Sequence, residues 1–148
     1  MQKLAILVTK LSSWVLSKMG RGGSMPGRLG IKIAPDCLNH LKFGGPVILV
    51  TGTNGKTSTA NMVSDLMEEA GYKVVTNRKG DNLRVGITST LLSHCSLSGR
   101  VKADAAVLEV DELNMKYIVP ALPVTAIVVN NFFRDQLDRA GEMERIID

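Results

Sequence analysis

The chain has 148 residues, enough for one ordinary domain, and a compact chain of that length buries roughly 68–70% of its unfolded surface. Hydrophobic residues make up 45% and charged residues 22%, a globular composition that excludes a disordered tail. Two cysteines, Cys37 and Cys95, are too few for a disulfide scaffold or a structural zinc site in this chain, and they indicate a reducing, cytosolic compartment.

The net charge of +4 is unevenly distributed. Residues 1–50 carry seven Lys and Arg against one acid, Asp36, a net charge of +6, whereas residues 51–148 carry eleven against thirteen, a net charge of −2. Nucleic-acid binding favours a basic stripe with aromatic residues between the charges. Aromatic residues make up only 4% of the chain, so we expect no nucleic-acid partner.

The first segment, residues 1–19, predicts an amphipathic helix. Its apolar residues recur at helical spacing: Leu4, Leu7, Val8, Leu11, Val15 and Met19. Lys10 interrupts the apolar run, which excludes a secretory signal and a membrane-spanning helix. The helix either packs on its own domain or rests near an anionic membrane face. We expect the first alternative; the second would be helped by four basic residues, Lys3, Lys10, Lys18 and Arg21.

Glycine then punctuates the chain. Residues 20–30, GRGGSMPGRLG, are expected to break the helical structure, with a short helical piece following near residues 35–41. Residues 44–46 mark the start of the main domain. We therefore expect a basic helical arm at residues 1–44 and a second unit at residues 45–148.

Strand and helix patterns alternate through this second unit. Short apolar runs predict buried strands at residues 47–50, 73–76, 105–110 and 125–129. Helices are expected at residues 56–70, 83–93 and 111–119, the last ending before Pro120. This alternation predicts an α/β domain with a mainly parallel sheet, whose ligands bind at the carboxyl ends of the strands.

The sequence TGTNGKTS follows the first predicted strand and opens a helix, which is the context of a phosphate loop. Glycines let the backbone approach a ligand, amide groups and the helix N-terminus face the phosphates, and Lys56 adds positive charge. The Thr57 hydroxyl is a candidate Mg²⁺ ligand. The first glycine of the strict pattern would fall at Val50, so an ordinary turn with a chance Lys-Thr pair is the alternative. The ATP-binding candidates are Gly52, Thr53, Asn54, Gly55, Lys56, Thr57 and Ser58.

Polar residues follow the later strands as well. Glu109 ends the third strand, where it can reach a Mg²⁺ ion held by the loop; the alternative, a charge at a helix N-terminus, fits Asp111 and Glu112 better. The cluster at residues 130–139 suits a nucleotide or metal pocket, or a helix start capped by Asn131 or Asp135. Weaker substrate-loop candidates follow the second strand, where an ordinary polar turn is the alternative: Asn77, Lys79 and Asn82.

Three segments together resemble the Mur ligase superfamily: TGTNGKTS, LEVDE and NNFFRDQLDRAGE. The shortened loop of that superfamily, G-T-N-G-K-[ST], accounts for Val50. GRGGSMPGRLGIKI and NFFRDQLDR look like the MurT subfamily, the ATP-using subunits of lipid II isoglutaminyl synthase. The resemblance spans the chain from about Leu4 onward.

The resemblance implies that Lys56 and Asn131 bind ATP and that Thr57 and Glu109 hold Mg²⁺. Asp135 and Gln136 are further substrate-side or supporting candidates. Many Mur ligases have a histidine at the position of Gln136, which ligates a second metal. Glutamine is a poorer metal ligand than histidine, so a second metal is not expected here. An Asp-Gln pair at this position resembles the MurT subfamily.

The resemblance also implies a reaction, in which ATP activates the α-carboxyl of D-glutamate in the lipid II stem peptide as an acyl phosphate. Ammonia from a GatD-like glutaminase partner then gives D-isoglutamine. Such a protein is expected in the cytoplasm, where it meets lipid II at the inner membrane face. It would continue beyond Asp148 with more strands, a zinc ribbon and a ligase domain, so we expect an incomplete domain that lacks the catalytic acceptor residues and does not complete ligation alone.

Three alternatives remain open. The chain could belong to another Mur-type ligase, acting on a UDP-linked peptide or a folate, although its short arm argues against a full UDP-binding domain. It could be a P-loop NTPase binding module without ligase chemistry. It could also be a membrane or nucleic-acid adaptor that uses the +6 arm.

Overall fold

Four parallel strands form the centre of the computed structural model, which describes residues 1–20, 23–77 and 81–132. The strands are β1 (Val47–Thr51), β2 (Val74–Thr76), β3 (Ala105–Glu109) and β4 (Ala126–Val129). Their order in the sheet is β2-β3-β1-β4, and all three neighbouring pairs are parallel. The expected α/β fold with a parallel sheet is therefore confirmed.

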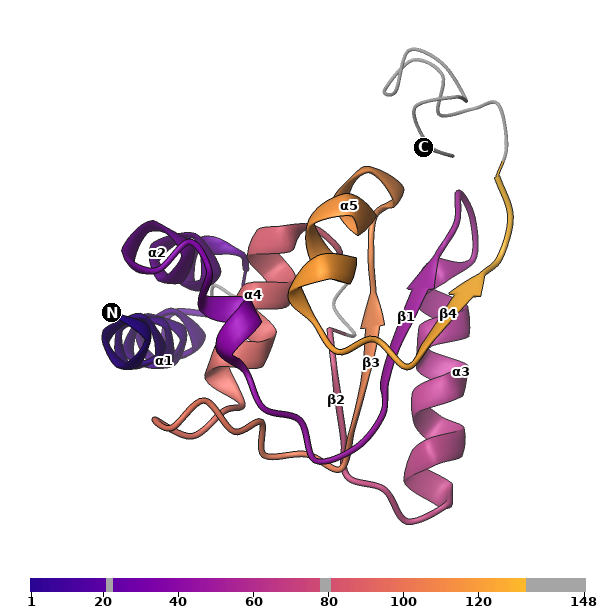
Figure 1. Cartoon of the computed structure of the whole chain (residues 1–148), viewed down its shortest axis with the longest axis horizontal. Coiled ribbons are helices and arrows are strands. Elements are labelled where there is room, and N and C mark those ends of the chain that lie inside the picture. The colour runs from indigo at the N-terminus through magenta and orange to yellow at the C-terminus, as the bar shows by residue number, and fades with distance from the viewer. Residues whose placement is uncertain (21–22, 78–80, 133–148) are drawn as a thin grey trace.

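Helices cover both faces of the sheet (Figure 1). Helix α3 (Lys56–Glu69) covers one face, where Val50, Ala60 and Val107 form a small buried cluster. Helix α4 (Arg84–Ser93) lies on the other side, against the larger core. Burial on both faces explains why the central strands read as continuous apolar runs. The predicted ends of these strands and helices are each within one residue of those observed.

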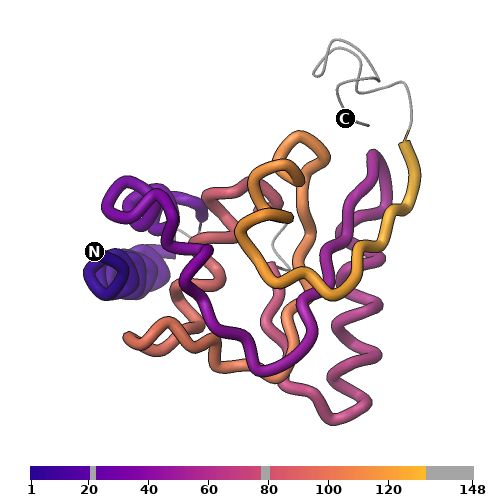
Figure 2. The backbone as a smooth tube through the Cα atoms, viewed as in Figure 1, coloured from indigo at the N-terminus to yellow at the C-terminus, as the bar shows by residue number. Residues whose placement is uncertain are grey.

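The N-terminal helices share the larger core with the sheet. They are α1 (Gln2–Lys18), α2 (Met25–Ile33) and the 3₁₀ helix η1 (Cys37–His40), and α1 and α2 form the outermost layer beyond α4 (Figures 1 and 2). Ile6 of α1 is fully buried and belongs to the same cluster as Leu49 of β1 and Leu91 of α4. The helices expected in residues 1–19 and near residues 35–41 are confirmed. The division between residues 44 and 45 stays a prediction.

The expectation that residues 20–30 break helical structure is wrong for their second half, because α2 begins at Met25. Pro26 lies in its first turn, where proline is tolerated. A Cβ atom at Gly27 would collide with the carbonyl oxygen of Val85, and one at Gly30 would lie 2.6 Å from Oγ1 of Thr9. These glycines, three positions apart, thus let α2 pack closely against α4 and α1.

The single helix expected at residues 111–119 is divided into three pieces. They are the 3₁₀ helix η2 (Glu112–Asn114), the short helix α5 (Met115–Ile118) and the 3₁₀ helix η3 (Val119–Ala121). The Asp111 side chain caps the first by accepting a hydrogen bond from the Leu113 amide at 3.1 Å, as its position before a helix suggested. Helix α5 ends before Pro120, as expected.

Strand β4 lies at the edge of the sheet and is the least covered of the four. Ile127 and Val129 expose 44% and 52% of their surface, so apolar residues at this edge reach solvent. Cys37 and Cys95 are free and fully buried, and burial raises the pKa of both thiols. Within the described ranges, every helix is too short or too polar to cross a lipid bilayer.

Substituting Gly27 by alanine should destabilise the chain, because the added methyl group forces α2 away from α4. We expect the free energy of unfolding to fall by about 1–3 kcal/mol, the usual cost of overpacking. Urea denaturation followed by circular dichroism measures this. Gly44→Ala is the matched control, since its Cβ would meet only Ala103 O, at 3.7 Å. Equal stability of the two variants would contradict the role assigned to Gly27.

Candidate nucleotide-binding site

The loop between β1 and α3 is built on two glycines with left-handed backbone. Gly52 has a φ of 132° and Gly55 a φ of 79°, conformations that side chains other than glycine rarely adopt. A Cβ atom at Gly52 would lie 2.9 Å from the backbone nitrogen and oxygen of Asn131. Both glycines are therefore required by the turn, and Gly52 also by the close approach of the chain after β4.

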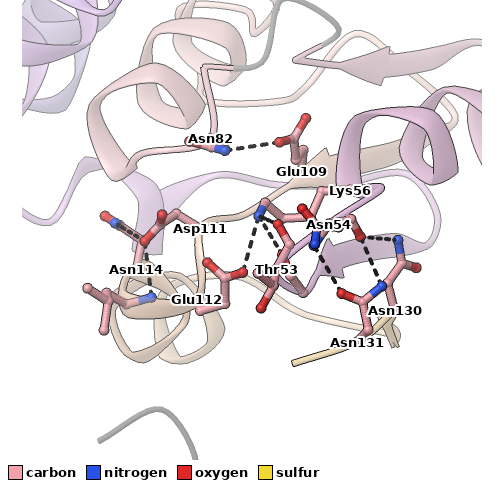
Figure 3. Close-up of polar contacts among 12 residues, drawn as sticks. Thr53, Asn54, Lys56, Asn82, Glu109, Asp111, Glu112, Asn114, Asn130 and Asn131 are labelled. Carbon is pink, nitrogen blue, oxygen red and sulfur yellow. Dashed lines mark hydrogen bonds and ion pairs between the residues drawn. The ribbon is translucent and has the colours of Figure 1, made fainter. Parts of the chain in front are cut away.

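Two asparagines after β4 hold the loop from the side (Figure 3). The Asn131 carbonyl accepts a hydrogen bond from the Thr53 amide at 2.7 Å, and its side-chain oxygen accepts one from the Asn54 amide at 3.0 Å. The Asn130 side chain donates to the Asn54 carbonyl at 3.2 Å and to Oγ1 of Thr59 at 2.9 Å. The structure thus places the Asn131 side chain on the loop backbone, and its contact with ATP stays a prediction.

The loop leads directly into the N-terminus of α3. The Thr59 amide donates to the Gly55 carbonyl at 2.9 Å, so the amides of Lys56, Thr57 and Ser58 precede this bond and have no acceptor within the helix. Thr57 and Ser58 are exposed. Amide groups and the positive end of the helix dipole thus converge on one accessible point, an arrangement that binds phosphate groups.

Lys56 is tied to the protein by three acceptors. Its ammonium group donates to the carbonyl oxygens of Gly52 and Thr53 and forms an ion pair with Glu112 at 3.1 Å (Figure 3). The side chains of Lys56 and Glu112 are only 10% and 3% exposed. An ammonium has three protons to donate, so a phosphate must replace one of these acceptors before it can bind Lys56.

Glu109 lies at the end of β3, beside the loop, and is held on several sides. Its carboxylate accepts hydrogen bonds from Oγ1 of Thr57 at 2.8 Å and from the Asn82 side chain at 2.9 Å. The Asn77 side chain donates to the Glu109 carbonyl and accepts from the Glu109 amide, both at 2.8 Å. The Asn77 side chain thus pairs with the Glu109 backbone in the place of a further β2 residue. This contact fixes the backbone of Glu109 and the direction of its side chain.

The donor set fits a magnesium ion. Glu109 is 4% exposed, and among the described residues its carboxylate contacts neutral donors and has no ion-pair partner. A buried carboxylate without a cation is costly, and a cation bound between Glu109 and Thr57 would compensate it. Hydroxyl and carboxylate oxygens are ligands that Mg²⁺ prefers, and it commonly takes the remaining ligands from phosphates and water.

The structure brings most of the predicted site residues to one place, and it assigns some of them a supporting position. Asn77 and Asn82, predicted either to contact a substrate or to support the site, both hold Glu109. Lys79, Asp135 and Gln136 lie outside the described residues. The pairing of Glu112 with Lys56 is not predictable from the sequence, which indicates for Glu112 only a charge at a helix start.

The Lys56–Glu112 pair should show strong coupling in a double-mutant cycle. Lys56→Met leaves the deeply buried Glu112 carboxylate without its cation and should lower the free energy of unfolding by about 3–5 kcal/mol. Adding Glu112→Gln to that variant should restore about 1–3 kcal/mol. Urea titrations of the four proteins measure the coupling.

The exposed Lys73→Met is the control for loss of a lysine and should change the unfolding free energy by less than about 0.5 kcal/mol. Additive effects of Lys56→Met and Glu112→Gln would show that the pair contributes no interaction energy.

Comparison with known proteins identifies the family. Residues 50–148 match the family described as the Mur ligase middle domain. Lipid II isoglutaminyl synthase (glutamine-hydrolyzing) subunit MurT from Streptococcus pneumoniae is 36% identical over 140 residues, which cover 95% of this chain and 31% of the relative. The same subunit from Staphylococcus aureus (strain COL) is 31% identical over 149 residues, covering 99% of this chain and 33% of the relative.

A more distant similarity involves UDP-N-acetylmuramoylalanine–D-glutamate ligase from Nitrobacter winogradskyi, which is 36% identical over 99 residues, covering 67% of this chain and 19% of the relative. The chain thus spans about a third of the length of the MurT relatives and a smaller part of this ligase. Because residues 50–148 match its middle domain and the MurT relatives are similar over nearly the whole chain, the chain belongs to the Mur ligase family.

Proposed function

We propose that this chain is the ATP-binding part of a ligase subunit that activates the α-carboxyl of D-glutamate in the lipid II stem peptide. The activated group is an acyl phosphate, and amidation converts it to D-isoglutamine during peptidoglycan synthesis. The supporting observation is the extent of similarity: the two MurT relatives match 95% and 99% of the chain, so their similarity includes α1 and α2. The D-glutamate-adding ligase matches only 67%.

The contribution of these residues to such a reaction follows from their positions. The amides at the start of α3 bind the terminal phosphates, and Lys56 exchanges Glu112 or a loop carbonyl for a phosphate oxygen. Glu109 and Thr57 hold Mg²⁺, which when bound neutralises charge on the transferring phosphoryl group. Catalysis of phosphoryl transfer consists mainly of such positioning and charge stabilisation.

The proposed partner is a glutaminase of the GatD type, which would form a heterodimer with this subunit and deliver ammonia from glutamine. The name of the MurT relatives, which describes a glutamine-hydrolysing synthase acting on lipid II, supports this assignment. The substrate would then be lipid-linked, and the subunit would work in the cytoplasm, at the inner face of the membrane.

A second candidate is a ligase that joins an amino acid to a UDP-linked precursor. The similarity to the Nitrobacter ligase over 99 residues favours it, because the nucleotide site lies within the family domain that both share. A third candidate, nucleotide hydrolysis without any acceptor, uses the same loop and the same Lys56.

The three candidate functions differ in the amine that they use and in the acceptor that receives it, so an assay of both distinguishes them. The whole protein, incubated with a GatD-type glutaminase, glutamine, Mg·ATP and lipid II, should yield lipid II lighter by about one mass unit, as expected for replacing a hydroxyl by an amide. Mass spectrometry of the peptide measures this. Amino-acid addition to a UDP-linked precursor, or phosphate release that is independent of any acceptor, would overturn the proposal.

Removing the Lys56 ammonium should weaken nucleotide binding. Because Glu112 would lose its cation, the comparison is between Lys56→Ala/Glu112→Gln and Glu112→Gln alone. Loss of a charge-assisted phosphate contact of about 1.5–3 kcal/mol should raise the dissociation constant about 10- to 150-fold. Calorimetric titration with a nonhydrolysable Mg·ATP analogue measures it. Lys73→Ala is the control, and unchanged affinity in the double variant would refute the role of Lys56.

Replacing Glu109 by glutamine should act on the metal rather than on the nucleotide. Gln keeps the shape and can still hydrogen-bond Thr57 and Asn82, but it loses the negative charge that attracts Mg²⁺. We expect the Mg²⁺ concentration needed for half-maximal nucleotide binding to rise at least about tenfold, the effect of losing roughly 1.4 kcal/mol. Affinity without Mg²⁺ should not decrease. An unaltered Mg²⁺ titration, equal to that of the exposed control Glu69→Gln, would contradict this assignment.

A further inference from the structure

The outward side of α1 carries an exposed apolar stripe, formed by Leu4, Leu7, Leu11, Trp14 and Val15. These side chains expose between 42% and 61% of their surface. Their spacing of three, four, three and one residues puts them on one face of the helix. The helix therefore presents a continuous apolar strip along its length to the outside of the molecule.

The opposite side of α1 is fixed to the domain. Ala5, Ile6 and Thr9 are fully buried, and Oγ1 of Thr9 donates to the Pro26 carbonyl of α2 at 3.2 Å. Lys10 donates to the Ser93 carbonyl of α4 at 2.9 Å. Because the helix is held from behind, the stripe cannot turn inward. Helix α1 itself lies at one end of the molecule, beside α2 and beyond α4 (Figures 1 and 2).

The charges around the stripe all have one sign. Residues 1–35 contain no acid, and the first one, Asp36, pairs with His40. Four basic residues of α1 and α2 are exposed: Lys3, Lys18, Arg28 and Lys32. The Lys18 ammonium lies 5.0 Å from the centre of the Trp14 ring. A partner that fits must offer apolar volume and negative charge together.

We propose that the α1 stripe binds the surface of an anionic lipid bilayer, with the helix lying flat in the headgroup region. A helix with leucine and tryptophan on one side, lysine at its margins and no acid has the composition of interfacial helices. Anionic headgroups supply the charge that the lysines attract, and the acyl boundary accepts the apolar side chains. This inference goes beyond the proposed function, which it complements by bringing the nucleotide site close to a lipid-linked substrate.

Trp14 makes the proposal directly measurable, because it is the only tryptophan of the chain and lies within the stripe. The full chain is mixed with vesicles of phosphatidylglycerol and phosphatidylcholine in equal parts, and with vesicles of phosphatidylcholine alone. We expect the emission of Trp14 to shift to the blue and to resist acrylamide quenching with the anionic vesicles only. Added salt should reduce the effect, because it screens the lysines. Unchanged emission with the anionic vesicles would overturn the proposal.

Two leucines of equal exposure form a matched pair of variants. Leu11 in the stripe and Leu66 on α3, which covers the other face of the sheet, are both 61% exposed. Leu11→Gln should weaken vesicle co-sedimentation at least about fivefold, because it removes an apolar side chain from the lipid boundary, whereas Leu66→Gln should have no effect. Equal weakening by both variants, or a dimer that Leu11→Gln dissociates in the absence of vesicle binding, would overturn the proposal.

Nucleotide affinity separates this proposal from the proposed function. Leu11→Gln should bind the Mg·ATP analogue as the unaltered chain does, which also shows that the variant is folded. If Leu11→Gln loses vesicle binding but keeps nucleotide binding, the result supports the proposed lipid-binding role of the α1 stripe and does not test the proposed function. Intact vesicle binding together with absent nucleotide binding would contradict the proposed function and leave the lipid surface standing.

Discussion

The buried ammonium of Lys56 is the constraint around which the rest of the site is arranged. A lysine that is only 10% exposed must replace most of its lost water by acceptors of the protein, and it finds them in two loop carbonyls and Glu112. The loop can curl around its own lysine only because Gly52 and Gly55 adopt left-handed backbone. The same curled backbone directs amides toward the point where a phosphate would bind. The loop conformation that surrounds Lys56 is thus also the one that would bind a phosphate.

Neutral amide side chains fix this geometry. Asn77 and Asn82 hold Glu109 from the side of β2, and Asn130 and Asn131 hold the loop from the side of β4. A side-chain amide both donates and accepts, so it can pair with a backbone N–H and C=O without adding charge. The buried charges here are Lys56 and three carboxylates, Glu109, Asp111 and Glu112, an excess of negative charge that a divalent cation would offset.

The sequence predicted the strands, the loop and Glu109 because each rests on a local pattern: an apolar run, two glycines at fixed spacing, an acid at a strand end. Interactions over long separations were not predictable in this way. Lys56 and Glu112 are 56 positions apart, and only the register of β1 against β3 brings them together. Helix α2 was missed for a different reason, because glycine lowers helix propensity but also allows close packing, and at Gly27 and Gly30 the packing dominates.

One face of α1 packs into the core and the other carries the exposed apolar stripe, so the stability of the fold and the exposure of the stripe depend on the same helix. Ala5 and Ile6 lie in the same core as the β1 strand that leads into the nucleotide loop, so detaching α1 to hide its outward leucines would expose part of the core that supports that loop. A free amphipathic helix can roll until its apolar side is covered, but a helix buried along its back cannot. The packing that supports the loop between β1 and α3 thus also keeps the α1 stripe exposed. The exposed apolar side chains stay in unfavourable contact with water until a surface outside the domain covers them.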